Sequence, residues 1–354
     1  MIQQTQTNSN NNTCWAGLDV GKHNFQAALI RPGQCWPELS LRELPTRNFP
    51  RTLEGVEAFC AWLGEEGAGT EVRAVMEATG NYSEKLALML YQYRPTLAPA
   101  IANARQTHAF IKSLGLRSKT DALDARALAC YGAERRPAPF EPALPEYLAL
   151  RHLVRHRQQL VKQQLALSNI QSEGTPDKFV ARSRKLLLRA LDREIAKAEK
   201  RMHAHIAQSP ELNADCALLC SIYGVAFLTA SSILAELGDL RKFARARQLA
   251  AFTGLSPRQY QSGSSIDRPA HLCKHGNGRV RKALYMAALT AIRDEGPMQR
   301  CYERLLANGK CKMSAIGTVM RKLLVLMRAI LISGQPYDRQ WKTPGKQLNE
   351  EANL

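Results

Sequence analysis

Two short apolar segments within the first hundred residues each end at a carboxylate, and this pattern constrains the fold more than any other feature of the sequence. The segment 14–20 carries Asp19 near its end, and residues 72–76 are followed at once by Glu77. Both segments have the length and composition of buried strands. An unpaired carboxylate is costly at such a position. The pair therefore favours a functional site, although a salt bridge or a helix cap would explain either acid alone.

Helical patterns alternate with these strands as far as residue 135. In addition, the pattern predicts strands at 25–30 and 96–101 and helices at 52–64, 82–93 and 119–131. Strands that alternate with helices indicate an α/β domain, which we place at 14–135. The polar residues 1–13 are expected to form a disordered leader, and the proline-rich residues 136–144 are expected to form a linker.

The character of the sequence changes between residues 145 and 208. Leu153, Leu160 and Leu167 fall seven residues apart, and after a break at 174–176 the apolar residues continue at helical spacing. Such a repeat predicts a helical hairpin or coiled-coil arm. Its surface is rich in Arg and Lys, a composition that is also typical of an ordinary solvated helix face.

The remaining residues predict a mainly α-helical C-terminal domain at 213–335, followed by a loose polar tail at 336–354. Helices are expected at 226–237, 279–294 and 312–333. Between the first two of these helices lies a turn-rich stretch, 253–265, which contains the sequence Gln-Ser-Gly-Ser-Ser. Its Gly, Ser and Pro content is typical of a loop.

The charge of the chain is unevenly distributed. Of the 354 residues, 49 are Lys or Arg and 31 are Asp or Glu, which gives a net charge of +18. Residues 1–100 hold 8 basic and 10 acidic residues, so that residues 101–354 hold the other 41 and 21. A cationic field of this size favours a polyanionic partner, and nucleic acid is the commonest one.

Several classes of protein are disfavoured by the same sequence. No apolar run is long enough for a transmembrane helix, and the first residues lack the basic and apolar regions of a secretion signal. The nine cysteines include no Cys-x-x-Cys pair, which is typical of reduced thiols in a cytoplasmic protein. The spacing within His271–His275 is poor for zinc, and no phosphate-binding P-loop motif occurs.

Asp121 and Asp124 extend the candidate acidic site. They lie three residues apart in the helix expected at 119–131, so both carboxylates share one face of it. Together with Asp19 and Glu77 they form a set of four carboxylates of the kind that binds Mg²⁺, and paired ions stabilise phosphoryl displacement. We therefore hypothesise a magnesium site, while the pattern alone leaves surface ion pairs open for each acid.

Ser262 is a candidate nucleophile. Cations near it in the sequence would take up the charge that grows on an attacked phosphate. The same stretch is also compatible with an ordinary flexible loop, and chemistry alone does not separate Ser262 from its neighbours Ser264 and Ser265. The basic residues expected to contact nucleic acid are Lys119, Arg126, Arg182, Arg184, Lys185, Arg258, Arg268, Lys274, Arg279, Arg281 and Lys282.

Five sequence blocks carry a resemblance to a known family. In the N-terminal half they are Gly-Leu-Asp-Val-Gly-Lys at 17–22, Glu-Ala-Thr-Gly-Asn-Tyr at 77–82 and Lys-Thr-Asp-Ala-Leu-Asp-Ala-Arg at 119–126. In the C-terminal half they are the stretch 252–265 and the block Arg-Lys-Ala-Leu-Tyr-Met at 281–286. These blocks resemble those of insertion-sequence transposases of the one-ten/one-eleven-eleven type, in the family's order, from about residue 14 to 335.

This resemblance implies a fold and a site. The first domain is expected to be RuvC-like, with the ribonuclease H fold, and its Asp, Glu, Asp, Asp set of Mg²⁺ ligands falls on Asp19, Glu77, Asp121 and Asp124. The family's serine that becomes covalently joined to DNA falls on Ser262. The resemblance also implies homo-oligomers, dimers or tetramers, that are joined through the coiled-coil arm and form composite sites across subunits. A structured non-coding bridge RNA would guide the choice of donor and target DNA.

The sequence therefore predicts a cytoplasmic DNA recombinase, associated with the nucleoid when active, that moves an insertion sequence. Strand cleavage would be Mg²⁺-assisted and would pass through a covalent phosphoserine intermediate. Two alternatives remain: a metal-dependent junction-resolving nuclease that uses the carboxylates without a serine, and a non-catalytic nucleic-acid-binding scaffold. One departure is Tyr223-Gly224, where the family often has Pro-Gly in a helix–hairpin–helix-like turn, and the glycine that the turn needs is kept.

Overall fold

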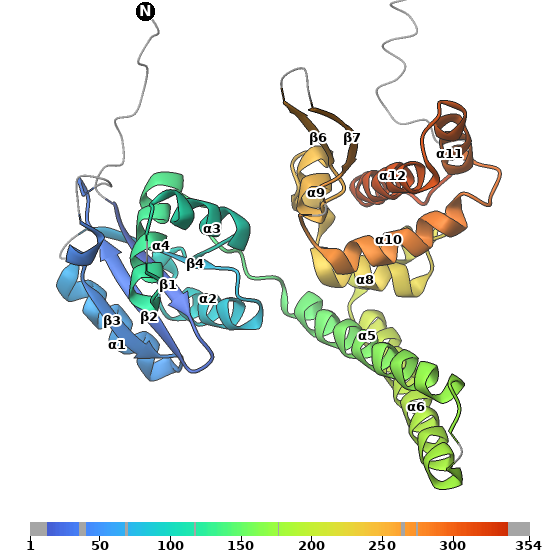
Figure 1. Cartoon of the computed structure of the whole chain (residues 1–354), viewed down its shortest axis with the longest axis horizontal. Helices are drawn as coiled ribbons and strands as arrows, with labels where there is room; N and C mark the ends of the chain where they lie inside the picture. Colours follow the sequence, from blue (N-terminus) through green and yellow to red (C-terminus); the bar gives the residue numbers. More distant parts are fainter. Residues whose placement is uncertain are drawn as a thin grey trace, which may run out of the picture. The chain divides into compact units, whose positions relative to one another are not determined.

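A five-stranded mixed sheet in the order β3-β2-β1-β4-β5 forms the middle of the first part of the chain (Figure 1). β1 pairs antiparallel with β2, and β2 antiparallel with β3, whereas β4 runs parallel to β1 and β5 parallel to β4. β1, β3 and β4 therefore point the same way, and their ends share what we term the carboxyl end of the sheet. The strands are β1 (Thr13–Val20), β2 (Asn24–Ile30), β3 (Thr46–Pro50), β4 (Glu71–Glu77) and β5 (Ala100–Ala102).

The computed structural model describes residues 13–34, 40–67, 70–116, 118–175, 177–262, 266–273 and 275–338, of which 259–262 and 266–270 are described by their backbone alone. The chain divides into two compact units, Met1–Pro142 and Ala143–Leu354. None of the described helices combines the length and the apolar character needed to cross a membrane.

Helices cover both faces of the sheet in the first unit. Alternate residues of β1 pack on opposite sides: Leu18 belongs to the cluster that includes α1 and α2, and Trp15 belongs to the cluster that includes α3 and α4. Burial of both faces explains the near-continuous apolar runs of β1 and β4. The helices are α1 (Leu53–Glu66), α2 (Asn81–Tyr93), α3 (Ala104–Ser113) and α4 (Asp121–Arg135).

α4 lies directly against β1 because Gly17 has no side chain. A Cβ atom built at Gly17 would lie 2.1 Å from the carbonyl oxygen of Ala125 and 2.1 Å from the amide nitrogen of Ala129. Gly132 makes a second close approach, since a Cβ there would lie 2.6 Å from the Trp15 ring. These distances are far below van der Waals contact, so both positions require glycine for the helix to sit where it does.

The second unit opens with two long helices, α5 (Pro145–Ser172) and α6 (Lys178–Gln208), which lie side by side as a helical hairpin (Figure 1). Arg157 and Glu199 form an ion pair of 2.7 Å between them. This agrees with the helical hairpin expected at 145–208, whereas a coiled coil with another subunit stays a prediction. Large apolar side chains are exposed along the hairpin, namely Leu165, Ile170, Phe179, Leu186 and Leu187.

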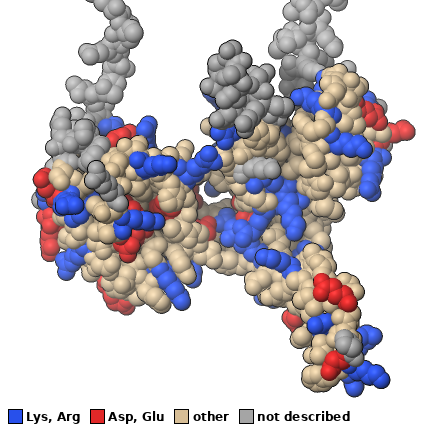
Figure 2. All heavy atoms as spheres, viewed as in Figure 1, with Lys and Arg blue, Asp and Glu red and all other residues tan. Residues whose placement is uncertain are grey.

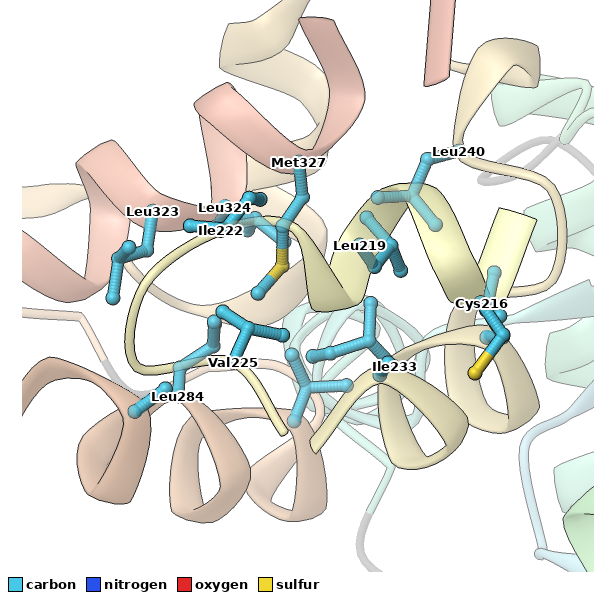
Figure 3. Packing of buried hydrophobic residues seen from close by; sticks show 14 of the residues in the cluster. Cys216, Leu219, Ile222, Val225, Ile233, Leu240, Leu284, Leu323, Leu324 and Met327 are labelled. Atoms are coloured by element: carbon cyan, nitrogen blue, oxygen red, sulfur yellow. The ribbon is translucent and has the colours of Figure 1, made fainter. Parts of the chain in front are cut away.

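Further helices and a hairpin complete the second unit around a large apolar core (Figure 3), and Cys301, Leu305 and Ala315 form a smaller separate cluster. In the turn between α7 and α8, Ile222 and Val225 point into this core beside Leu284. Gly224 has φ +87°, and a Cβ there would lie 2.7 Å from the Ala287 carbonyl oxygen, so the turn does require its glycine. The elements are α7 (Pro210–Cys220), α8 (Phe227–Leu237), α9 (Ala246–Thr253), β6 (Pro257–Ser262), β7 (Ile266–Leu272), α10 (Gly278–Ala291), α11 (Pro297–Ala307) and α12 (Lys312–Ser333).

The structure differs from the expected elements in three places. The stretch expected to be a loop at 253–265 is largely the strand β6, which pairs with β7, and both strands are polar because a two-stranded hairpin has little core to face. The strand expected at 96–101 is only β5, Ala100–Ala102, preceded by a 3₁₀ turn at Pro95–Leu97. The elements β3, α3, α7, α9 and α11 were not expected from the sequence.

We predict that Gly17→Ala destabilises the first unit by about 2–3 kcal/mol, because the new methyl group meets backbone atoms of α4 that cannot turn aside. Urea unfolding followed by tryptophan fluorescence measures the change. Gly64→Ala is the matched control: Gly64 lies in α1, and a Cβ there meets nothing within 4 Å. That variant is expected to gain about 0.5–1 kcal/mol from helix propensity. Equal stability of the two variants would contradict the close approach.

Candidate active site

Four acidic residues lie at the carboxyl end of the sheet. Asp19 follows Gly17 on the face of β1 that α4 covers, and Glu77 follows Val75 on the same face at the end of β4. Asp121 and Asp124 both lie in the first turn of α4. The Thr120 hydroxyl caps this helix by accepting a hydrogen bond of 3.2 Å from the Leu123 amide, so the start of α4 is fixed by its own sequence.

Electrostatic coupling shows that the four carboxylates are close. Burial, and after it the negative charges of Asp121, Asp124 and Glu77, raise the pKa of Asp19 to about 6, against an opposing effect of Lys119. Burial also raises the pKa of Asp124, where Lys119 again opposes and the neighbouring carboxylates add. The site therefore holds more negative charge than its surroundings compensate.

Glu77 is held by two residues of α3 that the sequence patterns did not single out. The buried Thr107 hydroxyl donates a hydrogen bond of 2.7 Å to Glu77 Oε2. The exposed His108 places Nε2 3.3 Å from Glu77 Oε1. No motif marks these residues, because Thr and His are ordinary on a helix surface and α3 itself was not expected.

The four carboxylates suit a divalent metal ion in their chemistry. Oxygen ligands with several negative charges are what Mg²⁺ binds, and such an ion would relieve the repulsion that raises the pKa of Asp19. Among the described residues, no three His, Cys, Asp or Glu side chains are already gathered into a metal-binding group. Both carboxylate oxygens of Glu77 contact α3, one at Thr107 and one at His108.

Ser262 is the last residue of β6, where its backbone pairs with Ile266 of β7. It therefore lies at the far end of the hairpin. Arg268, on β7, pairs with Tyr260 in the same ladder. Ser264, Ser265 and Lys274 lie outside the described residues. At the base of the hairpin, the Cys273 amide donates a hydrogen bond of 3.0 Å to the Ser256 carbonyl.

The predicted nucleic-acid contacts fall into two groups. Lys119, Arg182, Lys185, Arg258, Arg279 and Lys282 are exposed. Arg126, in contrast, donates from Nε to the Leu44 carbonyl at 3.1 Å. Arg281 donates to the carbonyls of Thr253 and Gly276, at 2.9 Å each. These two guanidinium groups hold the fold together as well as adding charge, and Arg184 approaches the Ile170 carbonyl at 3.4 Å.

A buried carboxylate organises the cations of the second unit. The side chain of Glu236 is 1% exposed and accepts hydrogen bonds from Arg155 at 2.8 and 3.0 Å and from Asn277 at 2.9 Å. Arg279 approaches it at 3.8 Å. Although burial opposes ionisation, hydrogen bonds from Arg155 and Asn277 hold the pKa of Glu236 below its usual value. Figure 2 shows Lys and Arg side chains gathered over the start of α10 and the adjoining part of α5.

Comparison with known proteins decides the family. Residues 16–171 match the DEDD transposase family named for IS110, and residues 216–303 match the Transposase IS116/IS110/IS902 family. A pilin gene-inverting protein of Moraxella bovis is 30% identical over 335 residues, which cover 92% of this chain and 98% of the relative. The chain belongs to the IS116/IS110/IS902 family of transposases.

A second relative of this IS110-family transposase is itself named a transposase. The transposase for insertion sequence element IS1111A of Coxiella burnetii is 43% identical over 81 residues, 23% of this chain and 22% of the relative. Membership of the family makes the chain a transposase or recombinase that acts on DNA. The match to the DEDD transposase family supports the expected RuvC-like fold and implies the use of a divalent metal.

We predict that Asp19→Asn stabilises the metal-free transposase at pH 8 by about 1–2 kcal/mol, after allowance for solvent screening of a half-buried group. Because the pKa of Asp19 is raised to about 6 in the folded state, the wild type loses stability as the pH rises from 3.8 toward 6. The asparagine carries no such penalty. Thermal unfolding in EDTA at several pH values measures the difference.

The same variant tests metal binding. Added Mg²⁺ is expected to raise the melting temperature of the wild type, since it neutralises the carboxylates, and to have little effect on Asp19→Asn. A variant at a distant acid, Glu57→Gln on the exposed face of α1, should respond to Mg²⁺ as the wild type does. An equal response of Asp19→Asn would remove Asp19 from the metal site.

We predict that Glu236→Gln destabilises the second unit by about 2–3 kcal/mol, because it weakens three charge-assisted hydrogen bonds and leaves Arg155 facing a neutral amide. Guanidinium unfolding monitored by circular dichroism measures the change. Glu303→Gln, an exposed acid on α11, is the control and is expected to stay within 0.5 kcal/mol of the wild type. Equal stability of the two variants would show that Glu236 does not hold this network together.

Proposed function

We propose that this chain moves an insertion sequence by cutting and rejoining DNA, with carboxylates of the first unit and Ser262 of the second both taking part. The observation that carries the proposal is the placement of Asp19, Glu77, Asp121 and Asp124 at the carboxyl end of the sheet, where their charges raise the pKa of Asp19. A relative named a gene-inverting protein favours rearrangement over cutting alone, because inverted DNA must be rejoined.

The role of the first unit is to hold divalent metal, for which Mg²⁺ is the natural choice. Asp19, Glu77, Asp121 and Asp124 are the proposed ligands. When bound, the ion would supply charge stabilisation for a phosphate undergoing displacement. Thr107 orients Glu77 by donating to one of its oxygens, and the cap at Thr120 orients the first turn of α4. Lys119 lies close enough for its charge to oppose the rise in the pKa of Asp19 and of Asp124.

The role of Ser262 is nucleophilic attack on the phosphorus of a DNA phosphodiester. The bond from Ser262 Oγ to phosphorus forms as the bond from phosphorus to one sugar oxygen breaks. The proton of the serine hydroxyl ends on that sugar oxygen, which leaves as a hydroxyl group. The number of phosphate esters is conserved, so the reverse attack by a strand end rejoins DNA without ATP. This agrees with the lack of a P-loop motif in the sequence.

Partners complete the proposal. The family resemblance supports a structured non-coding RNA that guides donor and target choice, and homo-oligomers joined through the hairpin of α5 and α6. The exposed cations of that hairpin, Arg182 and Lys185, suit a nucleic-acid backbone. Its exposed apolar residues Phe179 and Leu186 suit contact with another subunit.

We predict that Ser262→Ala loses the covalent protein–DNA adduct and strand exchange but still binds DNA and RNA, because only the attacking oxygen is removed. The assay incubates the full chain, its guide RNA and labelled element-end DNA with Mg²⁺, and then separates products under denaturing conditions. Ser264→Ala and Ser265→Ala are matched controls within the same stretch and should keep the adduct.

The outcomes separate the candidate functions. A labelled band that survives denaturation and depends on Ser262 supports the recombinase. Free cut ends without an adduct would indicate the metal-dependent junction nuclease, and binding without either product would indicate a scaffold. An adduct that persists in Ser262→Ala but disappears in Ser264→Ala or Ser265→Ala would move the nucleophile to that neighbour.

A further inference from the structure

Three strand ends bring an aromatic ring and two cations to the carboxyl end of the sheet, where the acidic residues also lie. Lys22 follows β1, Arg51 follows β3, and Tyr82 lies in the first turn of α2, shortly after β4. These strands run in the same direction. Lys22 is three residues from Asp19, and Tyr82 is five residues from Glu77.

Arg51 ties the three segments together. Its Nη2 and Nε atoms donate to the Lys22 carbonyl at 2.5 and 3.2 Å, and its backbone amide donates to the His23 carbonyl at 2.7 Å. The guanidinium carbon lies 4.8 Å from the centre of the Tyr82 ring. Arg51 thereby connects the Tyr82 ring to the residues that follow β1.

The arrangement is not explained by the stability of the fold. The Tyr82 residue is 38% exposed and belongs to none of the hydrophobic clusters of the unit, and Lys22 and His23 are exposed. A cation–π pair at an exposed site contributes only about 0.5–1 kcal/mol. Gly80 has φ +70° at the start of α2, a conformation that favours glycine, so the chain bends there to place Tyr82 at this end of the sheet.

We propose that Tyr82, Arg51 and Lys22 form a platform that holds an unpaired DNA nucleotide beside the phosphate on which the carboxylates act. This inference rests on the proposed function, since it names the form of DNA that enters the acidic site. A base stacks on the Tyr82 ring, and the ammonium and guanidinium groups face the adjoining phosphate.

Such a platform would offset the negative charge around the acidic site. Residues 1–100 have more acidic than basic residues, and the four carboxylates repel a phosphate backbone. Cations at the same end of the sheet attract the strand without occupying the metal site. Aromatic stacking requires an exposed base, so the platform selects a nucleotide that has left its base pair over one within an intact duplex.

Photocrosslinking of the full-length protein tests this platform. A single-stranded DNA oligonucleotide carrying 5-iodouracil is irradiated with the protein in EDTA, which prevents cleavage, and the crosslinked peptides are mapped by mass spectrometry. We expect a crosslink at Tyr82. Tyr82→Leu should lower the yield in this region by about tenfold, as expected for the loss of one stacked base, and Tyr82→Phe should retain most stacking.

Tyr91→Leu is the matched control, because Tyr91 is 40% exposed on the same helix, and its yield should equal that of the wild type. The proposal is overturned if residues of the first unit give no crosslink, if Tyr82→Leu crosslinks as well as Tyr82→Phe, or if only an RNA oligonucleotide of the same sequence reacts. The crosslink needs neither metal nor Ser262. Failure here is therefore distinct from failure of the covalent-adduct assay.

Discussion

The contact of α4 with β1 through Gly17 is the constraint on which the acidic site depends. A helix carried further out by even one methyl group would lift Asp121 and Asp124 away from Asp19. The backbone atoms of Ala125 and Ala129 occupy the volume that a side chain at Gly17 would fill. The lack of a side chain at Gly17 on β1 therefore determines where α4 places Asp121 and Asp124. Gly17 itself is two residues before Asp19.

The same closeness costs stability. Four carboxylates without a cation repel one another, and the pKa of Asp19 is raised first by burial and then by this repulsion. The apolar packing of the helices on both faces of the sheet offsets this loss of stability. In the second unit, where basic residues are in excess, the buried Glu236 contacts Arg155, Asn277 and Arg279. One carboxylate therefore fixes the positions of two cationic side chains. The excess of basic residues thus belongs to the second unit, whereas the first unit, Met1–Pro142, holds 15 basic and 14 acidic residues and gathers four of its acids at one end of the sheet.

Much of this arrangement was predictable from the sequence, and the reasons for the failures are physical. Asp19 and Glu77 were found because strands that are buried on both faces are recognisable, and an acid at their ends is conspicuous. Asp121 and Asp124 followed from helical spacing. Thr107, which holds Glu77, was missed because its importance arises from a contact 30 residues away in the chain. The β6–β7 hairpin was missed because its strands are polar, so that alternation of apolar and polar residues gave no signal. Arg281 was expected to contact nucleic acid, and no sequence pattern indicated that its guanidinium group also donates to two backbone carbonyls.

The bonds of Glu236 have a mechanical consequence. This carboxylate accepts hydrogen bonds from Arg155 on α5 and from the side chain of Asn277, the residue that caps α10. The backbone amide of Asn277 in turn donates to the carbonyl of Phe252, shortly before the hairpin of β6 and β7. The helical hairpin of α5 and α6 is thus connected by hydrogen bonds to the residues that precede the strand pair carrying Ser262. A displacement of α5 would therefore have to stretch these hydrogen bonds or carry the residues before the hairpin along with it.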